Sequence, residues 1–232
     1  MERYGDFLGR VSAFEVAELD LGKSYFRGRA SLADKIDEEN RLKAFFGDTV
    51  VFDLDEAVKN RISALADRLY SDAGDCLAER LSGATLHMTL HDLSNGTNLS
   101  EIQGKMAENE EKIRSISLPS RTIKMKSTFV FNMVNTSLVL GLVPADEEEH
   151  IKLMELYDIF DGILEAKYPL TPHITLAYFT PSGFGEEEKL RLEATVNEIN
   201  LDSQFEIILD TKKLHYQHFF SMNDYRNVLD FE

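Results

Sequence analysis

The stretch Thr85-Leu86-His87-Met88-Thr89-Leu90 returns in the second half of the chain as Thr171-Pro172-His173-Ile174-Thr175-Leu176. The pattern shared by the two copies is Thr-x-His-apolar-Thr-Leu. A single His-x-Thr match is weak, because short motifs of this kind often occur by chance. Two copies with the same flanking Thr and Leu are far more specific.

Both copies are expected to lie on β-strands, where residues i and i+2 point to the same face. His87 and Thr89 then share one face of the first strand, and His173 and Thr175 share one face of the second. The apolar residues between them pack beneath the strands. If the two copies lie in facing lobes, both His-Thr pairs converge on one cleft.

Two histidines at one substrate suit phosphoester chemistry. One neutral imidazole removes a proton from the attacking oxygen, and a second, protonated one donates a proton to the leaving oxygen. The unperturbed pKa of His, near 6.5, allows either state around neutral pH. Thr hydroxyls can donate hydrogen bonds to phosphate oxygens. The chain has no His-Glu-x-x-His pattern and no spacing that completes a zinc site, so no metal is expected.

The segments Leu86–Leu90 and Pro172–Leu176 resemble the paired motifs of the two-histidine (2H) phosphoesterase superfamily. Members of this superfamily include 2′-5′ RNA ligase-like proteins and cyclic nucleotide phosphodiesterases. The resemblance covers roughly residues 48–215 and implies a bilobal α+β fold with one motif on a strand of each lobe.

The resemblance also implies an activity, a hydrolase of the 2H phosphodiesterase type that needs no cofactor. Its substrate would be a 2′,3′-cyclic or 2′-5′ phosphodiester. His87 and His173 would be the acid/base pair, and Thr89 and Thr175 would bind the phosphate. The residues do not show which histidine is the base. An alternative is a nucleotide-binding or regulatory module on the same fold, without turnover.

One departure from the family pattern concerns positive charge. Many relatives carry an Arg shortly after the second motif, where this chain has Ala177-Tyr178-Phe179. Lys124 and Lys126 share one face of an expected strand, and they either supply the missing charge or form a solvated surface. Tyr178 and His91 are further candidate substrate contacts, although His91 equally fits a surface position at the end of its strand.

The charge balance limits the class of ligand. The 232 residues include 25 Lys and Arg against 41 Asp and Glu, a formal net charge of −16. Broad binding to nucleic-acid backbones needs many basic residues, so no binding of long nucleic acid is expected. The expected partner is a small nucleotide or a short oligonucleotide end in a local pocket.

Cysteine count and hydropathy add further expectations. One Cys excludes an internal disulfide framework and a multi-cysteine zinc site. The start of the chain shows no apolar leader, and no apolar run is long enough to span a membrane. A cytoplasmic monomer without membrane contact is therefore expected.

The remaining pattern predicts a single domain at residues 48–232, preceded by an N-terminal extension at residues 1–47. Strands and helices alternate, with hairpins between some strands, which favours α+β architecture with two mainly antiparallel sheets, flanking helices and a central cleft. Apolar runs and period-2 alternation predict strands at Thr49–Leu54, Leu86–Leu90, Arg121–Val134, Ser137–Val143, His173–Phe179, Phe205–Leu209 and Leu214–Phe220. Helical spacing predicts helices starting after Asp55 and at Asp146, and helices within 101–115 and 192–199.

Overall fold

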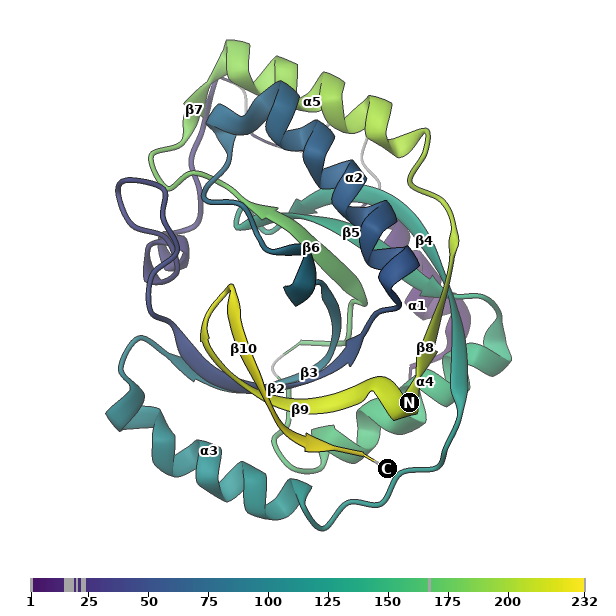
Figure 1. The fold of residues 1–232 in the computed structure, drawn as a ribbon. Helices are drawn as coiled ribbons and strands as arrows, with labels where there is room; N and C mark the ends of the chain where they lie inside the picture. Colours follow the sequence, from purple (N-terminus) through teal and green to yellow (C-terminus); the bar gives the residue numbers. More distant parts are fainter. Residues whose placement is uncertain (1, 15–18, 20, 22–23, 167, 232) are drawn as a thin grey trace.

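A computed structural model of the chain describes residues 2–14, 19, 21, 24–166 and 168–231, and it confirms an α+β fold (Figure 1). The helices in the described ranges are α1 (Tyr4–Ser12), α2 (Glu56–Ala73), α3 (Leu99–Ile113), α4 (Glu147–Asp161) and α5 (Glu186–Asn200). The strands there are β1 (Tyr25–Phe26), β2 (Phe46–Asp53), β3 (His87–Gly96), β4 (Thr122–Met133), β5 (Ser137–Pro144), β6 (His173–Tyr178), β7 (Phe184–Gly185), β8 (Glu206–Asp210), β9 (Leu214–Ser221) and β10 (Asp224–Asp230).

Two four-stranded sheets form the framework of the molecule. The first sheet has the strand order β10-β9-β2-β3 and the second has the order β6-β5-β4-β8, with every neighbouring pair antiparallel. Each sheet ends in the strand that carries one His-x-Thr motif. These two end strands, β3 and β6, lie against each other in the middle of the molecule (Figure 1). The fold therefore brings the two copies of the motif together.

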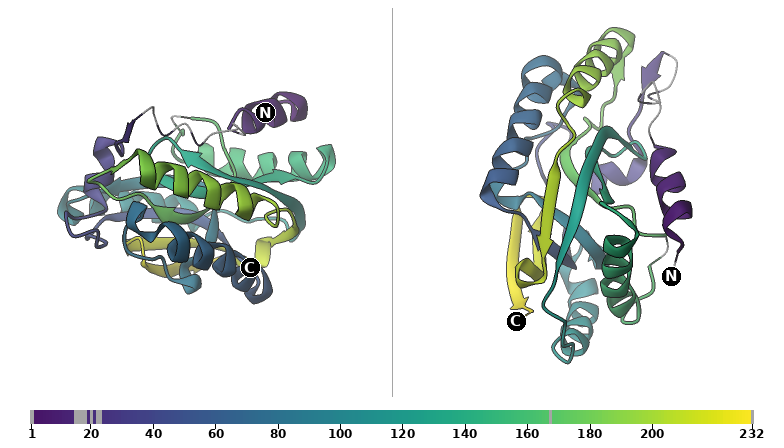
Figure 2. Two further views of the ribbon diagram at one scale, coloured as in Figure 1. Left: turned by 90° about the horizontal axis from the view of Figure 1, so that it is seen from above. Right: turned by 90° about the vertical axis from the view of Figure 1, so that its right-hand side faces the viewer.

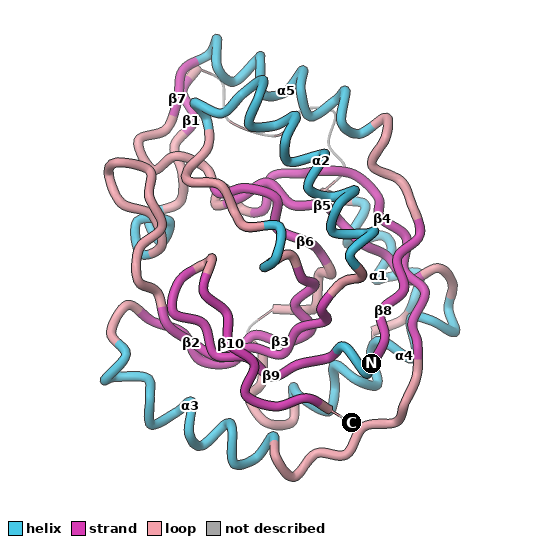
Figure 3. The backbone as a smooth tube through the Cα atoms, in the orientation of Figure 1, coloured by secondary structure: helices cyan, strands magenta, loops and turns pink. Residues whose placement is uncertain are grey.

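The helices cover the outer faces of the sheets. α3 packs on β2 and β3 of the first sheet. α2 and α5 run side by side and contact β6 and β4 of the second sheet (Figure 3). α4 contacts β4 and β5, and it lies with α1 on the other side of β4 from α2 (Figure 2). The second sheet is thus enclosed by helices, which explains why the apolar strand β5 is almost entirely buried.

Most of the expected elements are present, with two kinds of difference. β3 runs on to Gly96 instead of ending near Leu90, because it pairs with β2 along its whole length. The elements α1, β1, β7 and β10 are short or rich in charged residues, and the sequence pattern did not predict them. At the start of α4 the side chain of Asp146 caps the helix, because it accepts a hydrogen bond from the Glu149 N–H.

Apolar residues of the segment 1–47 pack into the same core as the rest of the chain. Phe7 of α1 is fully buried and its ring contacts that of His150 on α4. Phe26 of β1 is also buried and packs on Phe179 and Phe184. The first residues of this segment therefore reach the second sheet, and the last ones lead into β2.

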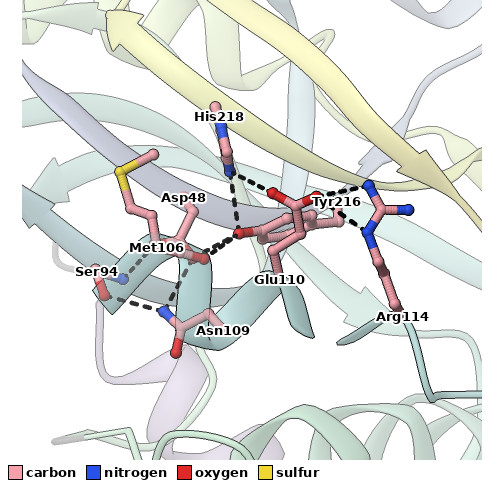
Figure 4. A network of polar contacts seen from close by, with 8 residues as sticks. All are labelled: Asp48, Ser94, Met106, Asn109, Glu110, Arg114, Tyr216 and His218. Carbon is pink, nitrogen blue, oxygen red and sulfur yellow. Dashed lines mark hydrogen bonds and ion pairs between the residues drawn. The ribbon is translucent and has the colours of Figure 1, made fainter. Parts of the chain in front are cut away.

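A buried polar network fixes α3 on the first sheet (Figure 4). The carboxylate of Asp48 on β2 accepts hydrogen bonds from the Ser94 N–H at 2.8 Å, from Asn109 Nδ2 at 2.9 Å and from the Tyr216 hydroxyl at 2.9 Å. These three donors come from β3, α3 and β9. The Tyr216 hydroxyl also lies 3.1 Å from Nε2 of His218. Because Asp48 is only 1% exposed, burial raises the pKa of its carboxyl group.

Replacing Asp48→Asn should destabilise the fold. The amide keeps one acceptor oxygen and turns an NH₂ group towards one of three buried donors, which leaves at least one of them unpaired. We expect the free energy of unfolding, measured by urea denaturation, to fall by about 1–3 kcal/mol. Asp72→Asn, at an exposed position of α2, is the matched control and should stay within about 0.5 kcal/mol of the wild type. Equal stability of the Asp48→Asn variant and the wild type would contradict this role.

Candidate active site

The side chains of both motifs line one cavity between the two sheets. His87 and Thr89 reach it from β3, and His173 and Thr175 reach it from β6. The cavity has a volume of about 560 Å³. The residue pairs that the sequence singles out are therefore neighbours in space, although they lie in different halves of the chain.

The same backbone irregularity follows each motif. On β3, Leu90 is the extra residue of a β-bulge between Thr89 and His91. On β6, Leu176 takes the matching place after the second motif. A bulge inserts one residue into the strand, so the side chains beyond it exchange faces. The structural repeat is therefore longer than the sequence match, because it includes the bulge.

His91 was expected as a candidate substrate contact, but it does not line the cavity, because the bulge on β3 turns its side chain to the other face of the strand. His91 is 2% exposed and points into the interior, where Nε2 lies 3.2 Å from Oδ1 of Asp161 at the end of α4. Its ring packs on Tyr157 of the same helix. Asp92 takes the place in the cavity that uninterrupted alternation assigned to His91. Its position was missed because a bulge leaves no simple signal in the hydrophobic pattern.

Tyr178 does line the cavity, and it occupies on β6 the position that Asp92 occupies on β3. Its hydroxyl donates a hydrogen bond to Sδ of Met222 at 3.0 Å. The hydroxyl is thus already engaged. Tyr178 presents its ring to the cavity.

Lys124 and Lys126 lie elsewhere. Both are exposed on β4, and Nζ of Lys126 donates a hydrogen bond to the Ala145 carbonyl at 3.2 Å. Neither lines the cavity. Of the two alternatives that the sequence leaves open, the structure supports the solvated sheet face.

Among the described residues, Lys35 is the lysine or arginine that lines the cavity, and the sequence analysis missed it. It directly follows the short 3₁₀ helix Ala30–Asp34, and its Nζ lies 5.0 Å from the ring centre of Phe45 and 5.4 Å from that of Tyr178. Within the described ranges, Lys35 forms no ion pair. No pattern in the sequence identified this residue, because it lies outside the repeat, in the segment 1–47.

The two histidine rings are held in the same way. Nδ1 of His87 lies 2.7 Å from the carbonyl oxygen of Thr85, and Nδ1 of His173 lies 2.7 Å from that of Thr171. A carbonyl oxygen only accepts, so each Nδ1 carries the proton of this hydrogen bond. Nε2 is then the nitrogen of each ring that is available for proton transfer.

The motif threonines have unused hydroxyl groups. Thr89 and Thr175 both line the cavity and are partly exposed. Neither hydroxyl makes a hydrogen bond to any residue in the part of the chain that the structure describes. Both are available to donate hydrogen bonds to a ligand.

Burial and nearby charges set the protonation of the two rings. Burial lowers the pKa of both His87 and His173, since it disfavours the charged imidazolium. The hydrogen bond to the Thr carbonyl and the negative charge of Asp92 act in the opposite direction on both rings. The charge of His173 also lowers the pKa of His87, and that of Lys35 lowers the pKa of His173. Asp92 therefore favours the protonated state of both rings, and the charge of Asp53 adds to its effect at His87.

The described residues contain no cluster of three or more His, Cys, Asp or Glu side chains arranged to hold a metal ion. Among the helices formed by these residues, none combines the length and apolar character needed to cross a membrane.

Comparisons with known proteins give fold-level matches only. No protein-family model matches the chain, and no curated protein matches it in sequence. A conserved protein of unknown function from Agrobacterium tumefaciens, ATU0111, matches with a TM-score of 0.73 at 17% identity, over 95% of this chain and 99% of that one. This match shows that the two proteins share their fold.

Other solved structures match more loosely. E. coli LigT complexed with ATP matches with a TM-score of 0.45 at 13% identity, over 81% of this chain and 96% of LigT. TT0787 of Thermus thermophilus matches with a TM-score of 0.45 at 14% identity, over 80% of this chain and 96% of that one. The fold assignment rests on the Agrobacterium protein.

The Asp92 carboxylate provides a test of the site that needs no substrate. In an NMR titration of the imidazole C–H signals, His87 and His173 should both titrate below the ordinary value near 6.5. In Asp92→Asn both pKa values should fall further, because a negative charge that stabilises both imidazolium ions is removed. Asp72→Asn should change neither. Unchanged or raised pKa values in Asp92→Asn would contradict this arrangement.

Proposed function

We propose that the protein is a metal-independent phosphodiesterase that acts on a 2′,3′-cyclic or 2′-5′ phosphodiester. The observation that carries the proposal is the pair of imidazole rings in one cavity. Each has Nδ1 held by a backbone carbonyl and Nε2 available. Two imidazoles at one phosphodiester provide a general base and a general acid. The resemblance of the two motifs to those of 2H phosphoesterases supports the same assignment.

The proposed reaction of a 2′,3′-cyclic phosphate needs only these groups and water. Nε2 of one neutral histidine takes a proton from water, and the water oxygen forms a bond to phosphorus. The bond between phosphorus and one ribose oxygen breaks, and that oxygen receives the Nε2 proton of the other histidine. At the end the two rings have exchanged protonation states. Asp92 favours the protonated state that the acid needs.

The phosphate-binding groups in this proposal come from three places in the chain. The free hydroxyls of Thr89 and Thr175 donate to the non-bridging oxygens from the two sides of the cavity. Lys35 supplies the positive charge that many relatives draw from an Arg after the second motif. Its Nζ lies over the aromatic rings of Phe45 and Tyr178, whose π-faces attract a cation.

Cavity size and charge support a small substrate. A volume of about 560 Å³ is in the ordinary range for sites that enclose a small ligand, about 300–1,000 Å³. A net charge of −16 disfavours extended contact with a polyphosphate backbone. The proposed substrate is therefore a mononucleotide or a short oligonucleotide end.

His87→Ala and His173→Ala should each lower turnover of 2′,3′-cyclic mononucleotides by about 10²–10⁴-fold, because each removes one proton-transfer group. The assay contains EDTA, and product is measured by chromatography. His215→Ala is the matched control, since His215 lies on β9 in contact with Asp230 and does not line the cavity. Absence of turnover by the wild type on cyclic and 2′-5′-linked substrates, or strict dependence on metal, would contradict the proposal.

The alternative on the same fold is a nucleotide-binding module without catalysis. It predicts binding of the nucleotide in calorimetry, with no product in the assay. Calorimetry run beside the assay therefore separates the two functions.

Lys35→Met should weaken phosphate binding while leaving the acid/base pair intact. Loss of a hydrogen bond to a charged group costs about 1.5–3 kcal/mol, which corresponds to about 10–100-fold in KM or in the Kd of a nucleoside monophosphate. Lys43→Met is the matched control, because Lys43 is exposed and donates to the Ala33 carbonyl outside the cavity. An unchanged KM in Lys35→Met would remove Lys35 from the site.

A further inference from the structure

The orientation of the two histidines depends on the backbone two residues before each one. The carbonyl groups of Thr85 and Thr171 accept the Nδ1–H bonds, so any rotation of these peptides turns the ring or frees it. Thr171 lies in the loop that leads into β6, and Thr85 is the last residue of a short 3₁₀ helix, Gly83–Thr85, in the loop that leads into β3. The contacts that hold these two loops in place therefore determine the orientation of the two imidazole rings.

The loop before the second motif is held by the N-terminal helix. Arg10 in the last turn of α1 donates from one guanidinium nitrogen to the hydroxyl of Thr171 at 2.8 Å, and from another to the carbonyl of Leu170 at 2.8 Å. The carboxylate of Glu2 holds the same guanidinium group, because it accepts hydrogen bonds from Nε at 3.0 Å and from Nη2 at 2.7 Å. The side chains of Arg10 and Glu2 are only 24% and 25% exposed, so the contact is partly shielded from water. Such a fork-shaped set of hydrogen bonds fixes geometry as well as position.

The loop before the first motif is held by the C-terminal hairpin. Asn223 lies in the turn between β9 and β10, where its Oδ1 accepts from the Ser82 N–H at 2.8 Å and its Nδ2 donates to the Arg80 carbonyl at 3.0 Å. Ser82 in turn accepts hydrogen bonds from the Thr85 hydroxyl at 2.9 Å and the Thr85 N–H at 3.0 Å through its carbonyl. The same hairpin places Tyr225 against the His87 ring, with 4.8 Å between the ring centres.

We infer that Arg10 and Asn223 are positioning residues, each of which aims one histidine of the acid/base pair. α1 and β10, near the two ends of the described chain, lie on opposite sides of the molecule (Figure 2). Each fastens the loop whose carbonyl orients one imidazole. The inference rests on the proposed function for its catalytic consequence, but its structural content is independent of any substrate.

The expected effect is on chemistry more than on binding. Removal of the Arg10 or Asn223 side chain leaves His87, His173, Thr89 and Thr175 in place and loosens one ring. A misplacement of about 1 Å can cost about 100-fold in rate. We expect kcat to fall about 10–100-fold in Arg10→Ala and in Asn223→Ala, with KM within about threefold of the wild type.

The decisive readout is the tautomer of each ring, measured by ¹⁵N NMR of the imidazole nitrogens at a pH where both rings are neutral. In the wild type both His87 and His173 should carry their proton on Nδ1. In Arg10→Ala the His173 signal should shift towards a mixture of tautomers while that of His87 stays unchanged. In Asn223→Ala the effect should be reversed. The signals are assigned from the spectra of His87→Ala and His173→Ala.

Two further variants separate positioning from a general loss of structure. Thr171→Val keeps the carbonyl group and removes the hydroxyl that Arg10 contacts, so it should act on His173 in the same direction as Arg10→Ala. Asn223→Asp keeps the acceptor for the Ser82 N–H and should retain most of the activity. Arg3→Ala is the control for α1, because its side chain is 89% exposed and pairs with Asp6. It should change neither ring.

The outcomes distinguish this inference from the proposed function. Selective tautomer changes in a protein without turnover would support the positioning roles and contradict the phosphodiesterase. Turnover in the wild type, together with variants that leave both tautomers and kcat unchanged or disturb both rings alike, would overturn the positioning roles and leave the phosphodiesterase standing.

Discussion

The site depends on one hydrogen bond that the protein makes twice, from Nδ1 of a histidine to the carbonyl oxygen two residues earlier. At His87 and at His173 the distance is the same, 2.7 Å. The bond selects the Nδ1–H tautomer and leaves Nε2 to the cavity. The sheets bring the two rings together, because β3 and β6 are the end strands of their sheets and lie against each other.

The surroundings of the rings balance opposing electrostatic effects. Burial lowers both pKa values, and Asp92 works against burial at both rings. Lys35 adds a positive charge to the lining of the cavity, while the chain as a whole carries a net charge of −16. A positive group inside an acidic molecule favours a small anion over a long polyanion. The charge balance and the cavity thus point to the same class of ligand.

The sequence predicts the two His-x-Thr motifs and their strands well. It predicts poorly the other residues around the cavity and the histidine rings. The two motifs, the strands that carry them and the α+β class follow from local patterns that the structure confirms. His91 and Asp92 exchanged roles because a β-bulge at Leu90 shifts the alternation by one residue. Lys35 and Arg10 lie in a segment that no pattern connected with the motifs. Their contacts are long-range, and long-range contacts leave no periodic signal in a single sequence.

We propose that both His-Thr pairs act on one phosphate group. A crystal structure of the protein with a nucleoside 2′-monophosphate tests this proposal. The phosphate should lie between the two strands, with Nε2 of His87 and Nε2 of His173 each within hydrogen-bonding distance of a phosphate oxygen. A phosphate bound outside the cavity, or one that contacts only one of the two rings, would contradict it.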